Sequence, residues 1–193
     1  MGINFFEDYR SWIEQSSLKF KSEQTIYITD LMSPIGSILI AATEEGICLL
    51  EFADRPTLDV ELQKLQQKLK ANIEVGDHRY LLQAQKELKE YFEGGRSNFE
   101  VPLHLIGTTF QQAVWDTLKD IPFGTTSTYL EQAKSLSKEK AVRAVASANG
   151  QNRILLLLPC HRIIGSNGNL AGYRGGVDRK KWLLDFERNT MKN

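Results

Sequence analysis

Hydrophobic and polar residues follow two different periods along the first half of the chain. Apolar stretches rich in β-branched residues predict strands, two of them joined by a tight turn at 44–46. Apolar residues spaced three and four positions apart predict helices. The predicted strands are 25–31, 37–42, 47–52 and 72–75, and the predicted helices are 3–20, 58–69 and 79–92. This order predicts an α/β domain built on a small antiparallel sheet with helices.

The second half of the chain has shorter and mostly helical segments. Helical spacing predicts helices over 110–119, 127–134, 138–148 and 179–188, and one apolar run predicts a strand over 154–158. The two middle helices are joined by a tight turn, which is typical of a helix-turn-helix but fits any pair of short helices. We therefore expect an N-terminal α/β domain over 1–103 and a mostly α domain over 104–193, while the pattern alone leaves open whether the helix pair is a DNA-binding helix-turn-helix.

Composition narrows the class of protein. The 193 residues are 41% hydrophobic and 25% charged, which is typical of a globular protein. The longest apolar run is too short to span a membrane, and the N-terminus lacks the basic stretch of a signal peptide. Only two cysteines occur, Cys48 and Cys160, which excludes a disulfide framework and favours a reducing compartment. We expect a soluble cytoplasmic protein with no membrane association.

The formal net charge of zero hides a difference between the two halves. Residues 1–106 hold 11 lysines and arginines against 17 acidic residues, a net charge of −6, and residues 107–193 hold 13 against 7, a net charge of +6. Such a division favours an anionic partner for the second half. Two halves that attract each other would explain the same charges equally well.

Cys160 is the strongest candidate for chemistry. It follows a proline at the end of an apolar run and precedes His161 and Arg162. A thiol reacts as thiolate, and a neighbouring base or cation favours that form. The alternatives are a buried structural cysteine and a Cys–His hydrolase, although side chains adjacent in sequence often point apart.

No metal site is indicated by the other candidate ligands. The two cysteines and three histidines show neither a C-x-x-C nor an H-x-x-x-H spacing. We expect His78 to be a solvated loop residue, His104 a strand residue and Cys48 a core residue.

Six separated motifs resemble the O6-alkylguanine-DNA alkyltransferases, also called methylated-DNA–protein-cysteine methyltransferases. The active-site motif is PCHRIIG at 159–165, and the resemblance covers essentially all of 107–188. The other motifs, in the family's order, are PFGTT at 122–126 with Tyr129, AVRAV at 141–145, NGQN at 149–152, GYRGG at 172–176 and KWLL at 181–184 with Glu187.

The resemblance implies that the helix pair of the mostly α domain is a DNA-binding helix-turn-helix and that the protein directly reverses DNA damage. The substrate would be double-stranded DNA carrying O6-alkylguanine, and O4-alkylthymine as well. Cys160 would accept the alkyl group irreversibly after the base is flipped, so that each molecule acts once, as a monomer and without a cofactor. An alkyltransferase-like protein that only binds lesions is a rival, but such proteins lack the reactive cysteine.

The resemblance also assigns site residues. Cys160, His161 and Glu187 would share a hydrogen-bond relay through a water molecule, and Asn152 would fix the turn before the active-site segment. Arg143 would fill the space that the flipped base leaves, Tyr129 would crowd the 3′ phosphate, and Tyr173 would donate to guanine. These roles are carried over position by position.

Two positions depart from the family pattern. Arg153 stands where the family usually has proline, which predicts a looser turn, and Arg174 stands where it usually has alanine or serine. Arg174 would narrow the base pocket or contact phosphate, and the sequence leaves the tolerance of large alkyl groups open. The zinc-binding cysteines of some members are absent from the N-terminal half, so no metal is expected.

Overall fold

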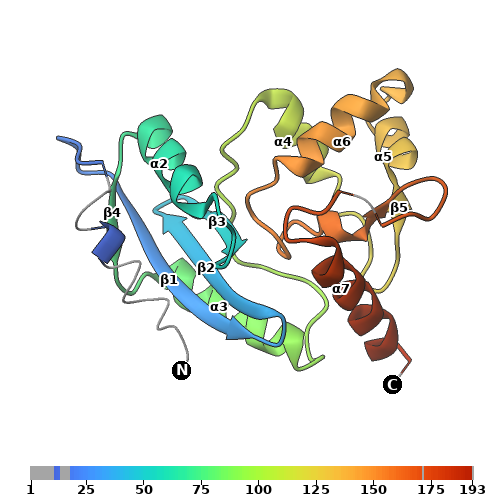
Figure 1. Cartoon of the computed structure of the whole chain (residues 1–193), viewed down its shortest axis with the longest axis horizontal. Coiled ribbons are helices and arrows are strands. Elements are labelled where there is room, and N and C mark those ends of the chain that lie inside the picture. The colour runs from blue at the N-terminus through green and yellow to red at the C-terminus, as the bar shows by residue number, and fades with distance from the viewer. Residues whose placement is uncertain (1–10, 14–17, 171, 193) are drawn as a thin grey trace. The chain divides into compact units, whose positions relative to one another are not determined.

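The computed structural model describes residues 11–13, 18–170 and 172–192 (Figure 1). The chain divides into two compact units. The N-terminal unit comprises the residues up to 93 together with 100–104, and the C-terminal unit comprises 94–99 together with the residues from 105 onward. Within the described ranges, no helix is long and apolar enough to cross a membrane.

A four-stranded sheet organises the N-terminal unit. Its strands lie in the order β3 (Gly46–Phe52), β2 (Gly36–Thr43), β1 (Thr25–Ser33) and β4 (Asn72–Val75). The first three pair antiparallel, as expected, but β4 pairs parallel with β1. The sheet is therefore mixed, and the predicted antiparallel pairing is wrong only at this edge. The helix α2 (Leu58–Leu69) carries the chain from β3 across to the far edge, and such a crossover delivers a parallel strand.

The helices of this unit begin and end where their hydrophobic spacing predicts. Helix α3 (Arg79–Phe92) packs against β1, β2 and β3, and its buried face includes Leu81, Leu88 and Tyr91. The helix predicted over 3–20 falls mostly outside the described residues. Of the part that is described, residues 11–13 are helical and 18–20 are not.

The C-terminal unit is mostly helical, as expected. Its helices are α4 (Thr109–Asp116), α5 (Tyr129–Ser135), α6 (Val142–Gly150) and α7 (Val177–Thr190), with 3₁₀ turns at Glu139–Ala141 and Cys160–Arg162. Capping boxes begin two of them: Thr108 pairs with Gln111 at α4, and Thr128 pairs with Glu131 at α5. The helix α5 begins two residues later than predicted because β5 (Ser127–Thr128) pairs in parallel with β6 (Ile163–Ile164).

The apolar run 154–158 is not a strand, and that prediction is wrong. The run folds into a tight turn, in which Leu157 N donates to Leu155 O at 2.8 Å and Leu158 N donates to Ile154 O at 3.0 Å. Leu156 has a φ of +67°, which no strand residue adopts. All five side chains are buried. The apolar character of the run therefore reflects burial, and the backbone finds its hydrogen bonds within the turn.

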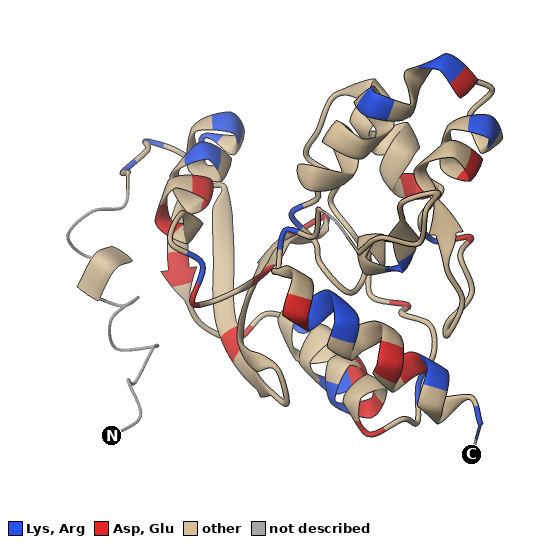
Figure 2. Cartoon of the chain, turned by 45° about the vertical axis from the view of Figure 1, so that its right-hand side comes forward, with Lys and Arg blue, Asp and Glu red and all other residues tan. Residues whose placement is uncertain are grey.

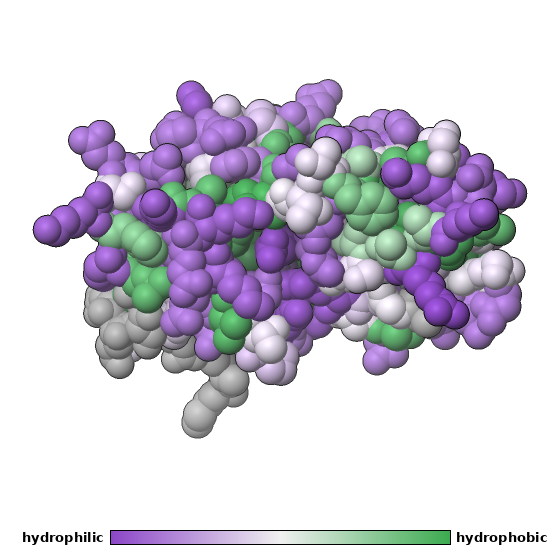
Figure 3. Space-filling model, turned by 90° about the horizontal axis from the view of Figure 1, so that it is seen from above, coloured by the Kyte–Doolittle hydropathy of each residue, from purple (hydrophilic) through white to green (hydrophobic). Residues whose placement is uncertain are grey.

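Large apolar side chains are scattered over the surface. One face is mainly hydrophilic, with smaller apolar areas between the polar groups (Figure 3). The exposed large apolar residues are Met32, Val60, Leu82, Leu130, Val177 and Met191. Single exposed residues of this kind are normal for a globular protein.

Candidate active site

The turn before Cys160 holds its thiol against a buried amide. Asn152, with no exposed surface, donates from Nδ2 to Leu158 O at 2.9 Å and to Cys160 Sγ at 3.2 Å. Its Oδ1 accepts from Ile154 N at 2.9 Å. The same side chain thus closes the turn and donates to sulfur, and a donated hydrogen bond favours the thiolate over the thiol.

A buried carboxylate lies beside the thiol segment. Glu187, on α7, accepts from His161 Nε2 at 2.8 Å, from Gly124 N at 3.0 Å and from the guanidinium of Arg162. Burial alone would raise the pKa of Glu187, but the hydrogen bonds and charges of His161 and Arg162 outweigh burial and hold this pKa at about 2. Glu187 is therefore a carboxylate at every physiological pH.

The imidazole of His161 is buried and oriented by that carboxylate. Burial lowers the pKa of His161, Glu187 opposes this, and the charges of Arg162 and Lys180 lower it further. The ring is therefore neutral near pH 7, and its Nε2–H faces the carboxylate. Nδ1 is then the basic nitrogen. It is buried and has no hydrogen-bond partner among the described residues, so it can receive a proton.

Lys180 is a buried cation that the motif comparison did not assign. It has no exposed surface, and its Nζ donates to Ile163 O at 2.5 Å. Burial lowers the pKa of Lys180, and attraction to the Cys160 thiolate opposes that shift. The sequence did contain a signal. Lys180, Leu183, Leu184 and Glu187 form the buried face of α7, so charged residues occupy two positions of an apolar stripe.

Two tyrosines lie near this cluster. Tyr129 is the first residue of α5, and burial together with repulsion from the Cys160 thiolate raises its pKa. Its hydroxyl would lie 3.5 Å from a Cβ at Gly172. Tyr173 is buried, with its ring edge-on to His161 at a centroid distance of 6.2 Å. The structure therefore brings both tyrosines to the segment that carries the thiol.

Arg143, Arg153 and Arg174 have different environments. Arg143 is exposed near the beginning of α6, and Arg174 is half-buried in the loop before α7. Arg153 donates from Nη1 to Ile106 O at 3.1 Å. Arg153 therefore ties the turn that follows α6 to the backbone of Ile106, and the looser turn stays a prediction.

The pair α5 and α6 presents a basic surface. Inside the pair, Asn149 Nδ2 donates to Gln132 Oε1 at 2.6 Å, and Trp115 Nε1 of α4 donates to Ala148 O at 2.8 Å. The first of these buried bonds ties α5 to α6, and the second ties α6 to α4. Lysines and arginines outnumber acidic residues around the turn between α5 and α6 (Figure 2): Lys134, Lys138, Lys140 and Arg143 are exposed there, together with Glu131 and Glu139.

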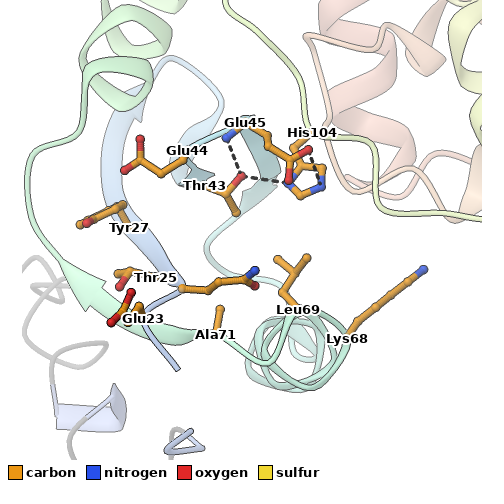
Figure 4. Close-up of a pocket in the computed structure, with 11 residues that line it drawn as sticks. Glu23, Thr25, Tyr27, Thr43, Glu44, Glu45, Lys68, Leu69, Ala71 and His104 are labelled. Atoms are coloured by element: carbon orange, nitrogen blue, oxygen red, sulfur yellow. Dashed lines mark hydrogen bonds and ion pairs between the residues drawn. The ribbon is translucent and has the colours of Figure 1, made fainter. Parts of the chain in front are cut away.

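The N-terminal unit holds a pocket of about 510 Å³ (Figure 4). On its wall, Thr43 Oγ1 lies 2.8 Å from His104 Nδ1, and Glu45 Oε2 lies 3.5 Å from His104 Nε2. His78, predicted to be a solvated loop residue, does lie in the loop before α3, but it is not solvated, since its side chain is 8% exposed. It caps α3, and its ring stacks on Tyr27 at 4.9 Å. The described residues include no group of three or more His, Cys, Asp or Glu side chains that could hold a metal ion.

The sequence matches two family models. Residues 26–105 match the ribonuclease-like domain of 6-O-methylguanine DNA methyltransferase, and residues 109–189 match the DNA binding domain of the same family. A methylated-DNA–protein-cysteine methyltransferase of Methanosarcina acetivorans is 41% identical over 167 residues, which are 84% of this chain and 98% of that protein.

Solved structures agree with the sequence matches. The crystal structure of Mycobacterium tuberculosis O6-methylguanine methyltransferase is similar with a TM-score of 0.73 and 34% identity, covering 86% of this chain and 94% of that one. The M. tuberculosis protein OGT, crystallised in complex with DNA, gives a TM-score of 0.72 and 35% identity over the same shares.

Proposed function

The chain belongs to the O6-methylguanine DNA methyltransferase family, and from this premise we propose that it repairs DNA by transferring an alkyl group from guanine O6 to Cys160 in a single turnover. The observation that carries the proposal is the buried cluster of Asn152, Cys160, His161 and Glu187 within the segment that matches the DNA-binding domain. We infer double-stranded DNA as the partner, with O4-alkylthymine as a second substrate.

The reaction is a displacement at the alkyl carbon. The thiol proton of Cys160 passes to Nδ1 of His161 through a water molecule, as in the family's relay. The sulfur–carbon bond forms while the carbon–O6 bond breaks, and the electron pair leaves with guanine. Tyr173 donates a proton that neutralises the leaving base and then regains one from the histidinium. The base is restored as guanine, and Cys160 becomes a thioether.

Single turnover follows from the stability of that product. Releasing an alkyl group from a thioether needs a strong nucleophile, and the proposed residues include no second one. His161 returns to its neutral form, but the alkylated sulfur of Cys160 carries no proton and cannot attack a second lesion. Each molecule therefore accepts one alkyl group.

Access to the lesion requires base flipping, which costs a few kcal/mol. We propose that Arg143 occupies the space left in the duplex and that Tyr129 crowds the 3′ phosphate. The exposed position of Arg143 and the basic surface of α5 and α6 support this. Arg174 is proposed to border the base pocket or to contact phosphate. We also propose that the protein acts as a monomer in the cytoplasm.

The decisive experiment mixes the protein with a duplex containing one O6-methylguanine and measures intact and peptide masses. The expected result is one methyl group per protein, confined to the peptide that contains Cys160. Restored guanine without a protein adduct would indicate a turnover enzyme. Binding without either change would indicate a lesion-binding protein, and both results would overturn the proposal.

A further inference from the structure

Arg162 is the most completely bonded buried cation of the site, yet the reaction above does not use it. It is 4% exposed. Nε and Nη2 each lie 3.0 Å from a different oxygen of Glu187, and Nη1 donates to Ile121 O at 2.7 Å. The guanidinium carbon also lies 5.7 Å from the ring centre of Phe123. The planar group is thus fixed on its edge and on one face.

This arrangement leaves Glu187 one direction in which to bond His161. Oε2 accepts from Arg162 Nε and from Gly124 N, and Oε1 accepts from Arg162 Nη2 and from His161 Nε2. Rotating the carboxylate would break at least two of these bonds. The carboxylate therefore holds the imidazole with Nε2–H toward α7, and Nδ1 is left as the proton acceptor.

Building on the proposed function, we propose that Arg162 is a positioning residue for proton transfer. Its Nε and Nη2 groups together fix the Glu187 carboxylate, and Glu187 in turn fixes the tautomer and the basicity of His161. A lysine could keep the charge at this place but not the two parallel bonds. Arg162 thus contributes in two ways, through its positive charge and through the geometry of its paired hydrogen bonds. A lysine at this position removes the paired bonds alone, and a glutamine removes the charge as well.

The positive charge of Arg162 acts on the imidazole of His161 together with several other groups. Glu187 and Lys180 from α7 and Arg162 from its own segment act on His161, whose chain neighbour is Cys160. The ring of Tyr173, from the loop before α7, lies edge-on to the imidazole. Arg162 and Lys180 both oppose protonation of His161, whereas Glu187 favours it. Removing the charge of Arg162 therefore makes His161 easier to protonate.

The experiment measures benzyl transfer from free O6-benzylguanine to the full chain between pH 5 and pH 9, so that DNA binding does not enter. In the unaltered protein the rate falls on acidification as His161 takes a proton. We expect Arg162→Gln to move the midpoint of this fall upward by about one pH unit and to lower the plateau about tenfold. Arg162→Lys should lower the plateau but keep the midpoint within about 0.3 unit, because the charge remains.

The matched control is Arg188→Gln, which removes an arginine next to Glu187 whose side chain is 56% exposed and pairs with Asp185. Its profile should equal that of the unaltered protein. Equal loss at every pH in Arg162→Gln, with an unmoved midpoint, would make Arg162 merely structural and overturn the inference. If Arg162→Gln does not fold, a midpoint in Arg162→Lys that moves upward by one unit overturns it in the same way.

A second measurement separates this inference from the proposed function. The ¹⁵N resonances of His161 in unreacted protein report its tautomer and its titration without any transfer. We expect Nε2–H in the unaltered protein and a higher titration midpoint in Arg162→Gln. An Nδ1–H tautomer would overturn the inference even where transfer occurs. Absence of transfer with the expected spectra would instead overturn the proposed function alone.

Discussion

The two units bury the same residue type in opposite surroundings. In the N-terminal unit, Cys48 lies in β3 among apolar residues, and its Sγ donates to Ala41 O at 3.5 Å. Burial raises the pKa of Cys48 to about 12, so this thiol stays protonated. In the C-terminal unit, Cys160 receives a hydrogen bond from Asn152 and lies within the field of Lys180. The reactivity that we propose for Cys160 therefore rests on its neighbours and not on burial, which the two cysteines share.

Buried carboxylates differ between the units in the same way. Glu61 in α2 pairs with Lys64, which is 57% exposed, and Glu87 in α3 accepts from the backbone of Glu100 and Val101. These bonds hold the fold of the N-terminal unit. Glu187 instead joins a histidine and an arginine that lie next to the thiol. The candidate active site is distinguished by buried charged groups that meet at one place beside the thiol, and not by how many such groups there are.

The largest expected effect separates the two cysteines. Cys160→Ala should abolish alkyl transfer, because no other thiol is activated, whereas Cys48→Ala should retain the rate of the unaltered protein. Mass measurement after incubation with a duplex containing O6-methylguanine decides this. An adduct on the Cys160→Ala protein would show that the nucleophile lies elsewhere.

The next effect concerns the buried carboxylates. Glu187→Gln leaves the guanidinium of Arg162 buried without its counter-ion, so we expect the free energy of unfolding to fall by about 3–5 kcal/mol. The control Glu61→Gln, in the N-terminal unit, should cost less than about 1 kcal/mol because its partner is solvated. Urea denaturation of both variants measures the difference, and equal losses would contradict the comparison.

A smaller effect tests the basic surface. Arg143→Ala should slow repair of duplex DNA about tenfold or more, since the flipped-out state loses its filling side chain. The rate with free O6-benzylguanine should not change. Arg79→Ala, which removes an exposed arginine from the N-terminal unit, should leave both rates as they are. A matching loss with the free base would remove Arg143 from base flipping.

The smallest effect is on stability in acid. The pKa of His161 is lower in the folded chain than its ordinary value of 6.5, so the unfolded chain binds the extra proton first. The contribution of His161 to the free energy of unfolding is complete above pH 6.5. As the pH is lowered from 6.5 to the pKa of the folded chain, this contribution falls by about 1.4 kcal/mol per pH unit. Urea denaturation from pH 7.5 to 5 should show this slope, and His161→Gln should reduce it. An unchanged slope in the variant would assign the acid dependence to other groups.

The amino-acid sequence by itself determined the local elements and the family. The bounds of α2, β4 and α3 agree with their hydrophobic spacing, because each is stabilised by burying one face of a regular period. The motifs from 122 to 187 identified the family, since they are contiguous residue patterns, and they named Cys160, His161 and Glu187 as a group.

Only the tertiary structure decided what depends on distant partners. Four features come from contacts that the spacing of hydrophobic residues along the chain does not predict. They are the parallel edge strand, the turn at 154–158, the cap made by His78 and the burial of Lys180. The paired hydrogen bonds of Arg162 join residues 25 positions apart in sequence. A charged side chain in a sequence is usually exposed, so its burial and its partner become visible only once the surrounding elements have packed around it.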